Sequence, residues 1–402
     1  MGDADGDLQV TNVRTALWTV LVVTLVSLAG DVGHAACGPM QRTASEIGAT
    51  ARQAQAELAR LNVPLTAEAF LTSAAHGNQH VVELFMQSGI GVDSRNADGF
   101  TALIWAAGQG QTSVVDFLLS KGANVNASSA DGTTALMAAA GEGRIAVVTR
   151  LIARGATIEA RRADGHTPLI RAAAQNQRAS VATLLDSGVD INGSDDKGRT
   201  ALIYAATNGN EEEPTGATLP LIALLLSRGA DVNRAERDGS TALMWAARKG
   251  EERVVRALLA GHADVNVADR QRRTPLMHAA LGSGSSAVAK VIIERGARIN
   301  ARDVQGSTAL SMAAKRRSVG TLNVLLGSGA DPNLPAADGT TPLMIATRFA
   351  RPANVQALLA KGANPAMKDA NGRIAADIAS VNHQTEILSM LTNASLAGHA
   401  NR

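Results

Sequence analysis

The residues of this chain that could do chemistry are few, and they form no catalytic or metal-binding motif. His76 and His80 stand four apart, a spacing seen in metal sites, but Gly77 places a turn between them and no acidic residue completes a ligand set. The signatures of zinc proteases, serine hydrolases and phosphate-binding loops are absent from the sequence. We therefore expect no catalytic residue, no metal and no cofactor, and the sequence argues against an enzyme.

A Thr-x-Leu tripeptide recurs along most of the chain, and five of its seven intervals are 33 residues long. Ala-Ala and Leu-Leu pairs follow at helical spacing, and Asp-Gly turn pairs precede five of the copies. The pattern predicts two short antiparallel helices per unit, each unit burying its apolar face against its neighbours. The copies begin at Thr101, Thr134, Thr167, Thr200, Thr241, Thr274, Thr308 and Thr341.

This pattern resembles the ankyrin repeat, because the period, Thr-Pro/Ala-Leu, Ala-Ala, Leu-Leu and Gly-Ala-Asp-Val-Asn segments all fall in register between about residues 66 and 395. The resemblance implies an all-α solenoid of about ten stacked helix-turn-helix repeats with hairpin-like loops. It also implies a role in binding other proteins. One departure runs through the array: the position after Leu, where the family favours His, holds Ile, Met or Ser. Apolar packing must therefore replace the hydrogen bonds of that His.

The places where the pattern starts and stops predict the domain boundaries. Residues 66–97 and 370–402 are degenerate copies that we expect to cap the stack, the latter with a short tail, and residues 98–369 hold eight full repeats. Residues 37–65 are either a linker helix or a partly disordered spacer. An acidic insertion at about 210–220, with Glu211 to Glu213, is an exposed loop that is either merely tolerated or in contact with a partner. His262 and Arg317 replace Gly at turns, which should strain both turns.

Residues 1–36 differ from the repeats. Arg14 precedes sixteen uncharged residues, 15–30, which are short for a membrane-spanning helix but suit the apolar core of a secretory signal. Cleavage is expected near Ala35 or Ala36, and an uncleaved inner-membrane anchor or lipidation at Cys37 are the alternatives. Because Cys37 is the only cysteine, no intramolecular disulfide can stabilise an exported product. These features favour a periplasmic or secreted bacterial protein.

Two sets of positions vary while the framework repeats, and they are the candidate partner contacts. The first is a slot in the middle of each first helix, occupied by residue types that dominate interface energies, although the two Trp side chains could instead pack between repeats. The second is basic and lies at helix ends and loop tips, which stacking should bring to one concave side. The candidates are Trp105, Arg171, Tyr204, Trp245 and His278 in the slot, Arg248, Lys249, Lys315 and Arg316 at helix ends, and Arg161, Arg162, Arg234 and Arg237 on loop tips.

The charge of the chain bears on its partner. The net charge is +2, and four Asp against one Arg in residues 1–36 leave +5 on the remainder. A modest basic stripe favours an acidic protein partner, whereas nothing indicates nucleic-acid binding or a homo-oligomer. The sequence thus predicts a non-enzymatic adaptor or scaffold in the envelope or outside the cell, in membrane contact only through its N-terminal segment. A secreted effector of a host protein and a membrane-anchored structural spacer are the alternatives.

Overall fold

The computed structural model of the protein describes residues 44–207, 218–282 and 285–400. The chain divides into residues 1–47 and residues 48–402, and the repeats lie in the second unit. Within the described ranges the regular secondary structure is helical, apart from isolated β-bridges in the loops. The predicted export segment with its cleavage site, Cys37 and most of the insertion at 210–220 lie outside the described residues.

After α1 (Ala44–Arg60), the described helices form ten consecutive pairs, which confirms the predicted all-α stack of two-helix repeats. The first helices of the pairs are α2 (Ala67–Ala75), α4 (Ala102–Gln109), α6 (Ala135–Gly141), α8 (Pro168–Ala174), α10 (Ala201–Thr207), α12 (Ala242–Lys249), α14 (Pro275–Leu281), α16 (Ala309–Ala314), α18 (Pro342–Arg348) and α20 (Ala375–Val381). The second helices are α3 (Gln79–Gln87), α5 (Thr112–Ser120), α7 (Ile145–Ala153), α9 (Arg178–Asp186), α11 (Leu219–Ser227), α13 (Glu252–Ala260), α15 (Ser286–Glu294), α17 (Gly320–Gly327), α19 (Pro352–Ala360) and α21 (Thr385–Ala400).

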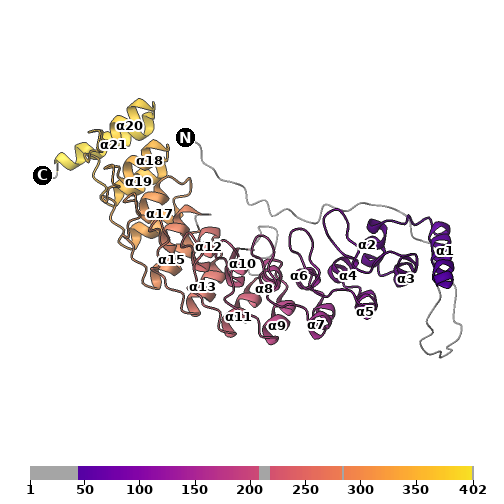
Figure 1. The fold of residues 1–402 in the computed structure, drawn as a ribbon. Helices are drawn as coiled ribbons and strands as arrows, with labels where there is room; N and C mark the ends of the chain where they lie inside the picture. Colours follow the sequence, from indigo (N-terminus) through magenta and orange to yellow (C-terminus); the bar gives the residue numbers. More distant parts are fainter. Residues whose placement is uncertain (1–43, 208–217, 283–284, 401–402) are drawn as a thin grey trace. The chain divides into compact units, whose positions relative to one another are not determined.

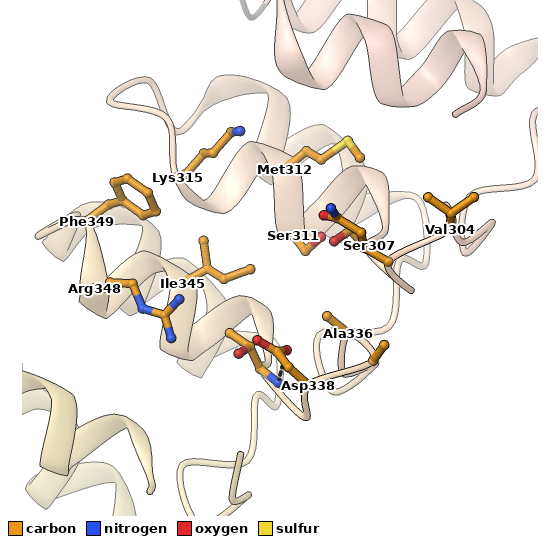
Figure 2. Close-up of a pocket in the computed structure, with 13 residues that line it drawn as sticks. Val304, Ser307, Ser311, Met312, Lys315, Ala336, Asp338, Ile345, Arg348 and Phe349 are labelled. Carbon is orange, nitrogen blue, oxygen red and sulfur yellow. Dashed lines mark hydrogen bonds between the residues drawn. The ribbon is translucent and has the colours of Figure 1, made fainter. Parts of the chain in front are cut away.

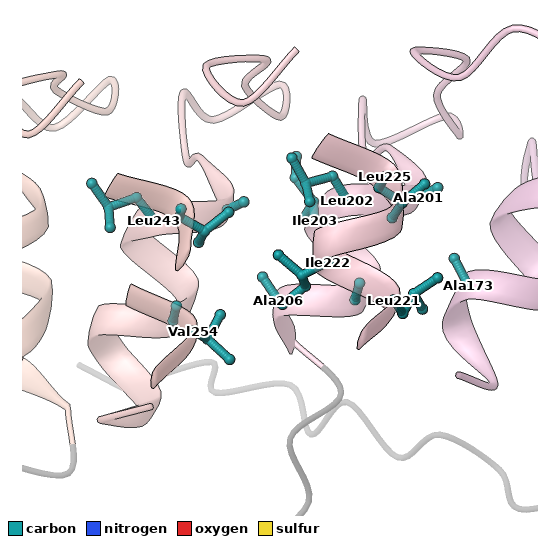
Figure 3. Packing of buried hydrophobic residues seen from close by; sticks show 14 of the residues in the cluster. Ala173, Ala201, Leu202, Ile203, Ala206, Leu221, Ile222, Leu225, Leu243 and Val254 are labelled. Carbon is teal, nitrogen blue, oxygen red and sulfur yellow. The ribbon is translucent and has the colours of Figure 1, made fainter. Parts of the chain in front are cut away.

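The helices of the repeats form two rows (Figure 1). Each first helix contacts the first helices of adjacent repeats, and the second helices contact one another in the same way. Apolar residues at the repeating positions fill the space between repeats, as Leu202 and Ile222 of one repeat and Leu243 of the next illustrate in Figure 3, all at most 1% exposed. Each repeat therefore buries its apolar face against its neighbours, which couples their stabilities.

The Thr of the repeating tripeptide directly precedes the first helix in each of the eight full repeats. In most repeats its side-chain oxygen accepts a hydrogen bond from the backbone N–H three residues on, as between Thr134 and Met137 at 3.3 Å. This bond satisfies one of the N–H groups left without a partner at a helix start. Seven of the eight full repeats have Ile or Met after Leu, and all seven of these side chains are buried. Ser311, the exception, accepts a hydrogen bond from the backbone N–H of Thr308 at 2.9 Å.

The two turns that lack glycine differ from each other. His262 has a φ of 65°, the left-handed conformation that its position predicts. The same prediction for Arg317 is wrong, because Arg317 is not among the residues with positive φ. There α16 ends at Ala314, and the buried side-chain amide of Asn354 donates to the carbonyls of Ala314 and Arg316, both at 2.9 Å. Since this amide satisfies the carbonyls at the helix end, no left-handed turn is needed.

Hydrogen bonds also join the loops of adjacent repeats. At the loop tips, the backbone N–H of Ala130 donates to the carbonyl of Asp98 at 2.9 Å, and equivalent bonds recur along the stack. Next to the second helices, a side-chain ladder runs in parallel. Asn126 Oδ1 accepts from the N–H of Thr157 at 2.8 Å, as Asn side chains do in later repeats. The loops are thus held in register, and so are the residues that they carry.

Candidate functional site

The predicted contact residues lie on the first helices, on the loops before them or, for Lys315 and Arg316, directly after α16. The loop before a first helix can turn back so that one of its residues lies beside the helix slot nine positions later. In three central repeats the slot residue donates a hydrogen bond to a carboxylate at this loop position. These pairs are Tyr204 with Asp195, Trp245 with Glu236, and His278 with Asp269.

Asp195 is the centre of the largest of these polar clusters. Its carboxylate is 1% exposed and accepts hydrogen bonds from the Tyr204 hydroxyl at 2.8 Å, from Arg199 Nε at 3.1 Å and from the backbone N–H groups of Lys197 and Arg199, both at 2.8 Å. Burial alone would raise the pKa of Asp195, but these hydrogen bonds and the Arg199 charge outweigh it and lower the pKa. The loop and α10 are therefore tied together through an ionised carboxylate.

Tyr204 completes this cluster. The Arg199 guanidinium lies over its ring, 4.5 Å from the centroid, and His166 Nε2 lies 2.7 Å from its hydroxyl oxygen. Burial and the hydrogen bond to Asp195 raise the pKa of Tyr204, so it stays a neutral donor. Because Tyr204 donates its proton to Asp195, His166 must donate through Nε2. Burial lowers the pKa of His166, consistent with a neutral imidazole in this position.

The next two pairs repeat the arrangement with other chemistry. The half-buried indole of Trp245 donates through Nε1 to the Glu236 carboxylate. Burial raises the pKa of Glu236 to about 7, even though this hydrogen bond opposes the shift. His278 is 3% exposed, and its Nε2 lies 3.1 Å from Asp269 Oδ2. Burial lowers the pKa of His278, so a neutral ring donates to Asp269.

The Glu236 carboxyl should make stability depend on pH. Because its folded-state pKa is raised from 4.5 to about 7, its stabilising contribution is complete only below pH 4.5 and is lost as pH rises through 7. Glu236→Gln keeps a carbonyl acceptor for Trp245 but cannot ionise. From about pH 5 to about pH 8, the wild type should lose about 1 kcal/mol of stability relative to this variant, a figure reduced from the full shift because the carboxyl is partly exposed.

Urea unfolding of both proteins at the two pH values measures this difference. Glu142→Gln, the same substitution at an exposed glutamate, is the matched control. A stability difference between wild type and Glu236→Gln that is the same at both pH values would contradict the raised pKa.

The slot candidates therefore differ in what they can offer a partner. Tyr204 and His278 are buried and hold their loops, so they position the surface and expose little of their own area. Trp105 and Trp245 are half-buried and pack against the core, which leaves part of each ring accessible. Arg171 is also half-buried, and its stem leaves no room for a Cβ at Gly141 in the preceding repeat.

Four of the basic candidates are engaged within the stack. Each reaches from its own repeat to a carbonyl or carboxylate of an adjacent repeat, so part of its charge serves cohesion between repeats. Their contacts are Arg161 Nη1 to the Ser194 carbonyl at 3.0 Å and Nη2 to Asp196 at 3.3 Å, Arg162 to Asp131 at 3.0 Å, Arg316 to the Leu281 carbonyl at 3.2 Å, and Lys249 to the Thr207 carbonyl.

The remaining basic candidates are exposed, and we group them with Arg270 and Arg348, which share their properties. In the described ranges their side chains form no hydrogen bond or ion pair, so their charge is available to a partner. They lie on loops and at the ends of first helices, all in the C-terminal half of the stack. These residues, which we call the free cations, are Arg234, Arg237, Arg248, Arg270, Lys315 and Arg348.

A hollow of 590 Å³ lies beside two of the free cations, Lys315 and Arg348. Residues of α16, of α18 and of the loops before them line it (Figure 2), with Met312 and Ile345 as the two slot residues. The sequence pattern did not indicate this hollow. A comparison of each slot residue with the residue nine positions before it could have found the hollow. Asp303 precedes Met312 and Ala336 precedes Ile345, and neither pair can form a side-chain hydrogen bond.

The comparison with family models bears on the whole stack. A model for ankyrin repeats (three copies) matches residues 70–162, 158–213, 215–303 and 310–399. The chain belongs to the ankyrin-repeat family. Ankyrin repeats generally mediate protein–protein interaction, and ankyrin-repeat proteins are typically non-enzymatic binding scaffolds. A search of curated proteins gave no match.

Metal sites and membrane spans are two other features that a stack of this kind could carry. Within the part of the chain that the structure describes, no group of three or more His, Cys, Asp or Glu is placed to hold a metal ion, and His76 and His80 are both exposed. None of the described helices is at once long enough and apolar enough to cross a membrane.

Proposed function

We propose that this ankyrin-repeat protein is a non-enzymatic adaptor or scaffold that binds an acidic protein partner through its first helices and hairpin loops. The set of free cations carries this proposal, because their side chains form no hydrogen bond or ion pair within the described chain and lie beside loops already fixed by hydrogen bonds. A surface that is ordered before binding loses little conformational entropy on binding. The free cations would attract acidic groups of the partner, which would raise the association rate and make the charges of the two surfaces complementary.

Export is part of the proposal. The uncharged segment at residues 15–30, followed by small residues at Ala35 and Ala36, supports a cleaved secretory signal and a periplasmic or extracellular location. The two alternative functions predict other locations. An anchored spacer would keep residues 15–30 in the inner membrane, whereas an effector would leave the cell.

Expression of the full chain in a Gram-negative host, followed by fractionation, N-terminal sequencing, mass measurement and cross-linking, tests the proposal. A start at Ala36 or Cys37 in the periplasm, with one protein cross-linked in stoichiometric amount, would support the exported adaptor. An intact Met1 in the membrane fraction would favour the spacer. Recovery from the medium without envelope retention would favour the effector.

The role of the free cations can be tested by reversing two charges. Arg248→Glu combined with Arg270→Glu should weaken partner binding by about tenfold or more at low salt, and the difference should shrink as salt screens the charges. The matched control is Arg154→Glu with Arg178→Glu, the same charge change at exposed arginines at the ends of second helices. Titration calorimetry with the cross-linked partner measures both. Equal losses in the two variants would mean that net charge, and not this face, determines binding.

A further inference from the structure

The hollow between α16 and α18 arises from the types of residue that meet there. In the central repeats a Tyr, Trp or His fills the slot and bonds to the loop. In the last two full repeats the slots hold Met312 and Ile345, which have no donor. Opposite Ile345 the loop residue is Ala336, which has neither the length nor the polar atom to reach it. The space between helix and loop therefore stays open, as Figure 2 shows.

The walls of this hollow combine polar residues with two large apolar side chains that are exposed. Phe349 is 47% exposed and Val304 is 50% exposed, and they are two of the six large apolar side chains that are exposed in the described residues. Both line the hollow, together with Met312 and Ile345. Exposed apolar groups gathered at one concavity are typical of a binding site, whereas single exposed apolar residues need no explanation. The volume of 590 Å³ is within the range of about 300–1,000 Å³ that ligand pockets have.

The charges at the hollow are not balanced. Lys315 and Arg348 line it, and their side chains make no hydrogen bond or ion pair with any described residue. Asp338 is the one acidic residue of the lining, and its carboxylate accepts a hydrogen bond from the backbone N–H of Thr340 at 2.9 Å. Hydrogen bonds from Thr340 and, to a lesser degree, the charge of Arg348 lower the pKa of Asp338, so one acidic group partly offsets the two cations. An occupant that covers Phe349 would also bring its own polar groups close to these two cations. A carboxylate there would gain from both.

We propose that this hollow anchors a segment of the protein partner in which a large apolar side chain is flanked by Asp or Glu. The apolar side chain would lie against Met312, Ile345 and Phe349, and the flanking carboxylate would face Lys315 and Arg348. This inference rests on the proposed function, since it specifies which part of the binding face selects the partner. A purely apolar segment would leave the two cations unpaired, and a small free carboxylate would leave Phe349 and Val304 uncovered.

Selection of a random-sequence peptide library against the full chain tests this inference and does not require the partner to be identified first. The selected peptides should be enriched in Asp or Glu next to Leu, Ile, Met or Phe. Fluorescence anisotropy with a selected peptide should show at least about tenfold weaker binding to Phe349→Lys and to Lys315→Glu. Because Phe349 and Lys315 are exposed, both variants are expected to fold, which circular dichroism checks.

Two control variants carry the same changes elsewhere. Ile145→Lys places a lysine at another exposed apolar residue, 41% exposed, and Arg154→Glu reverses another exposed charge. Both should bind the peptide as the wild type does. Peptides without the acidic and apolar pattern, binding that survives both hollow variants, or no dependence of any selected peptide on the hollow would each overturn the inference.

The cross-linked partner separates this inference from the proposed function. If partner binding is lost in the Arg248→Glu, Arg270→Glu double variant but kept in Phe349→Lys, the face binds a protein without using the hollow, and only the inference fails. If no partner is cross-linked but library peptides bind in the hollow, the proposed function fails, and with it the role of the hollow as a partner anchor, while its preference for acidic and apolar segments stands.

Discussion

Asp195→Ala is expected to lower the free energy of unfolding by about 3–5 kcal/mol, because it removes one member of a buried charged cluster and leaves the others without their acceptor. The Arg199 guanidinium, with a side chain only 16% exposed, would lose its counter-ion, and the Tyr204 hydroxyl would lose its acceptor. The backbone N–H groups of Lys197 and Arg199 would also be left unpaired. The loop of this repeat should then no longer be held against α10.

Asp369→Ala is the matched control for this prediction. Asp369 accepts from the backbone N–H groups of Asn371 and Arg373 in the same way, and it pairs with the Arg373 guanidinium at 2.8 Å. It receives no bond from its helix slot, where Ile378 stands, and the side chain of Arg373 is 50% exposed. Water can therefore solvate what the mutation leaves behind, and we expect a much smaller loss of stability than for Asp195→Ala.

Urea unfolding followed by circular dichroism measures both variants, and Tyr204→Phe should fall between them at about 1–2 kcal/mol. Equal losses of unfolding free energy for Asp195→Ala and Asp369→Ala would show that the hydrogen bond from Tyr204 to Asp195 adds no stability beyond that of the hydrogen bonds within the loop. In that case the loops of the central repeats would not be more rigid than the others, and the low entropy loss assumed for binding would not apply to them.

The fold could be predicted from the sequence because each repeat of a solenoid packs against its neighbours in the same way. One apolar pattern in register, with Thr at the helix start, determines each helix pair, and contacts between neighbours are the same in every copy. The failure at Arg317 has the opposite origin. Its turn depends on Asn354, a buried polar residue from the following repeat, and no pattern within the repeat of Arg317 indicates this.

The candidate site was harder to predict because its exposure depends on residue pairs. Tyr204 and Trp245 occupy the same slot, yet the first is 8% exposed and the second is half-buried. Arg161 and Arg234 lie on similar loops, but Asp196 engages only the first. These differences in exposure and pairing depend on the loop residue nine positions earlier or on a residue of the adjacent repeat. The residue type at a single position therefore does not predict whether its side chain is exposed.

Gly282→Ala is expected to lower the free energy of unfolding by about 3 kcal/mol, because a Cβ there would overlap the preceding repeat. Gly282 follows α14 with a φ of −76° and a ψ of −142°, so its φ alone does not require glycine. The added Cβ, however, would lie 1.7 Å from the carbonyl oxygen of Arg248 at the end of α12. The two helices must move apart to accept it, against the packing of the whole interface.

Gly327→Ala is the control, since a Cβ at this helical glycine meets no heavy atom within 4 Å. Alanine is favoured over glycine in a helix by up to about 1 kcal/mol, so this variant should be as stable as the wild type or slightly more stable. Unfolding of both variants, combined with partner binding, tests how close the repeats are at the site. Since Arg248 is one of the free cations, separating α12 from α14 should also displace this charge, and Gly282→Ala should weaken binding although it removes no contact residue. Normal binding by a destabilised Gly282→Ala would mean that Arg248 acts through long-range charge and not through its position in the stack.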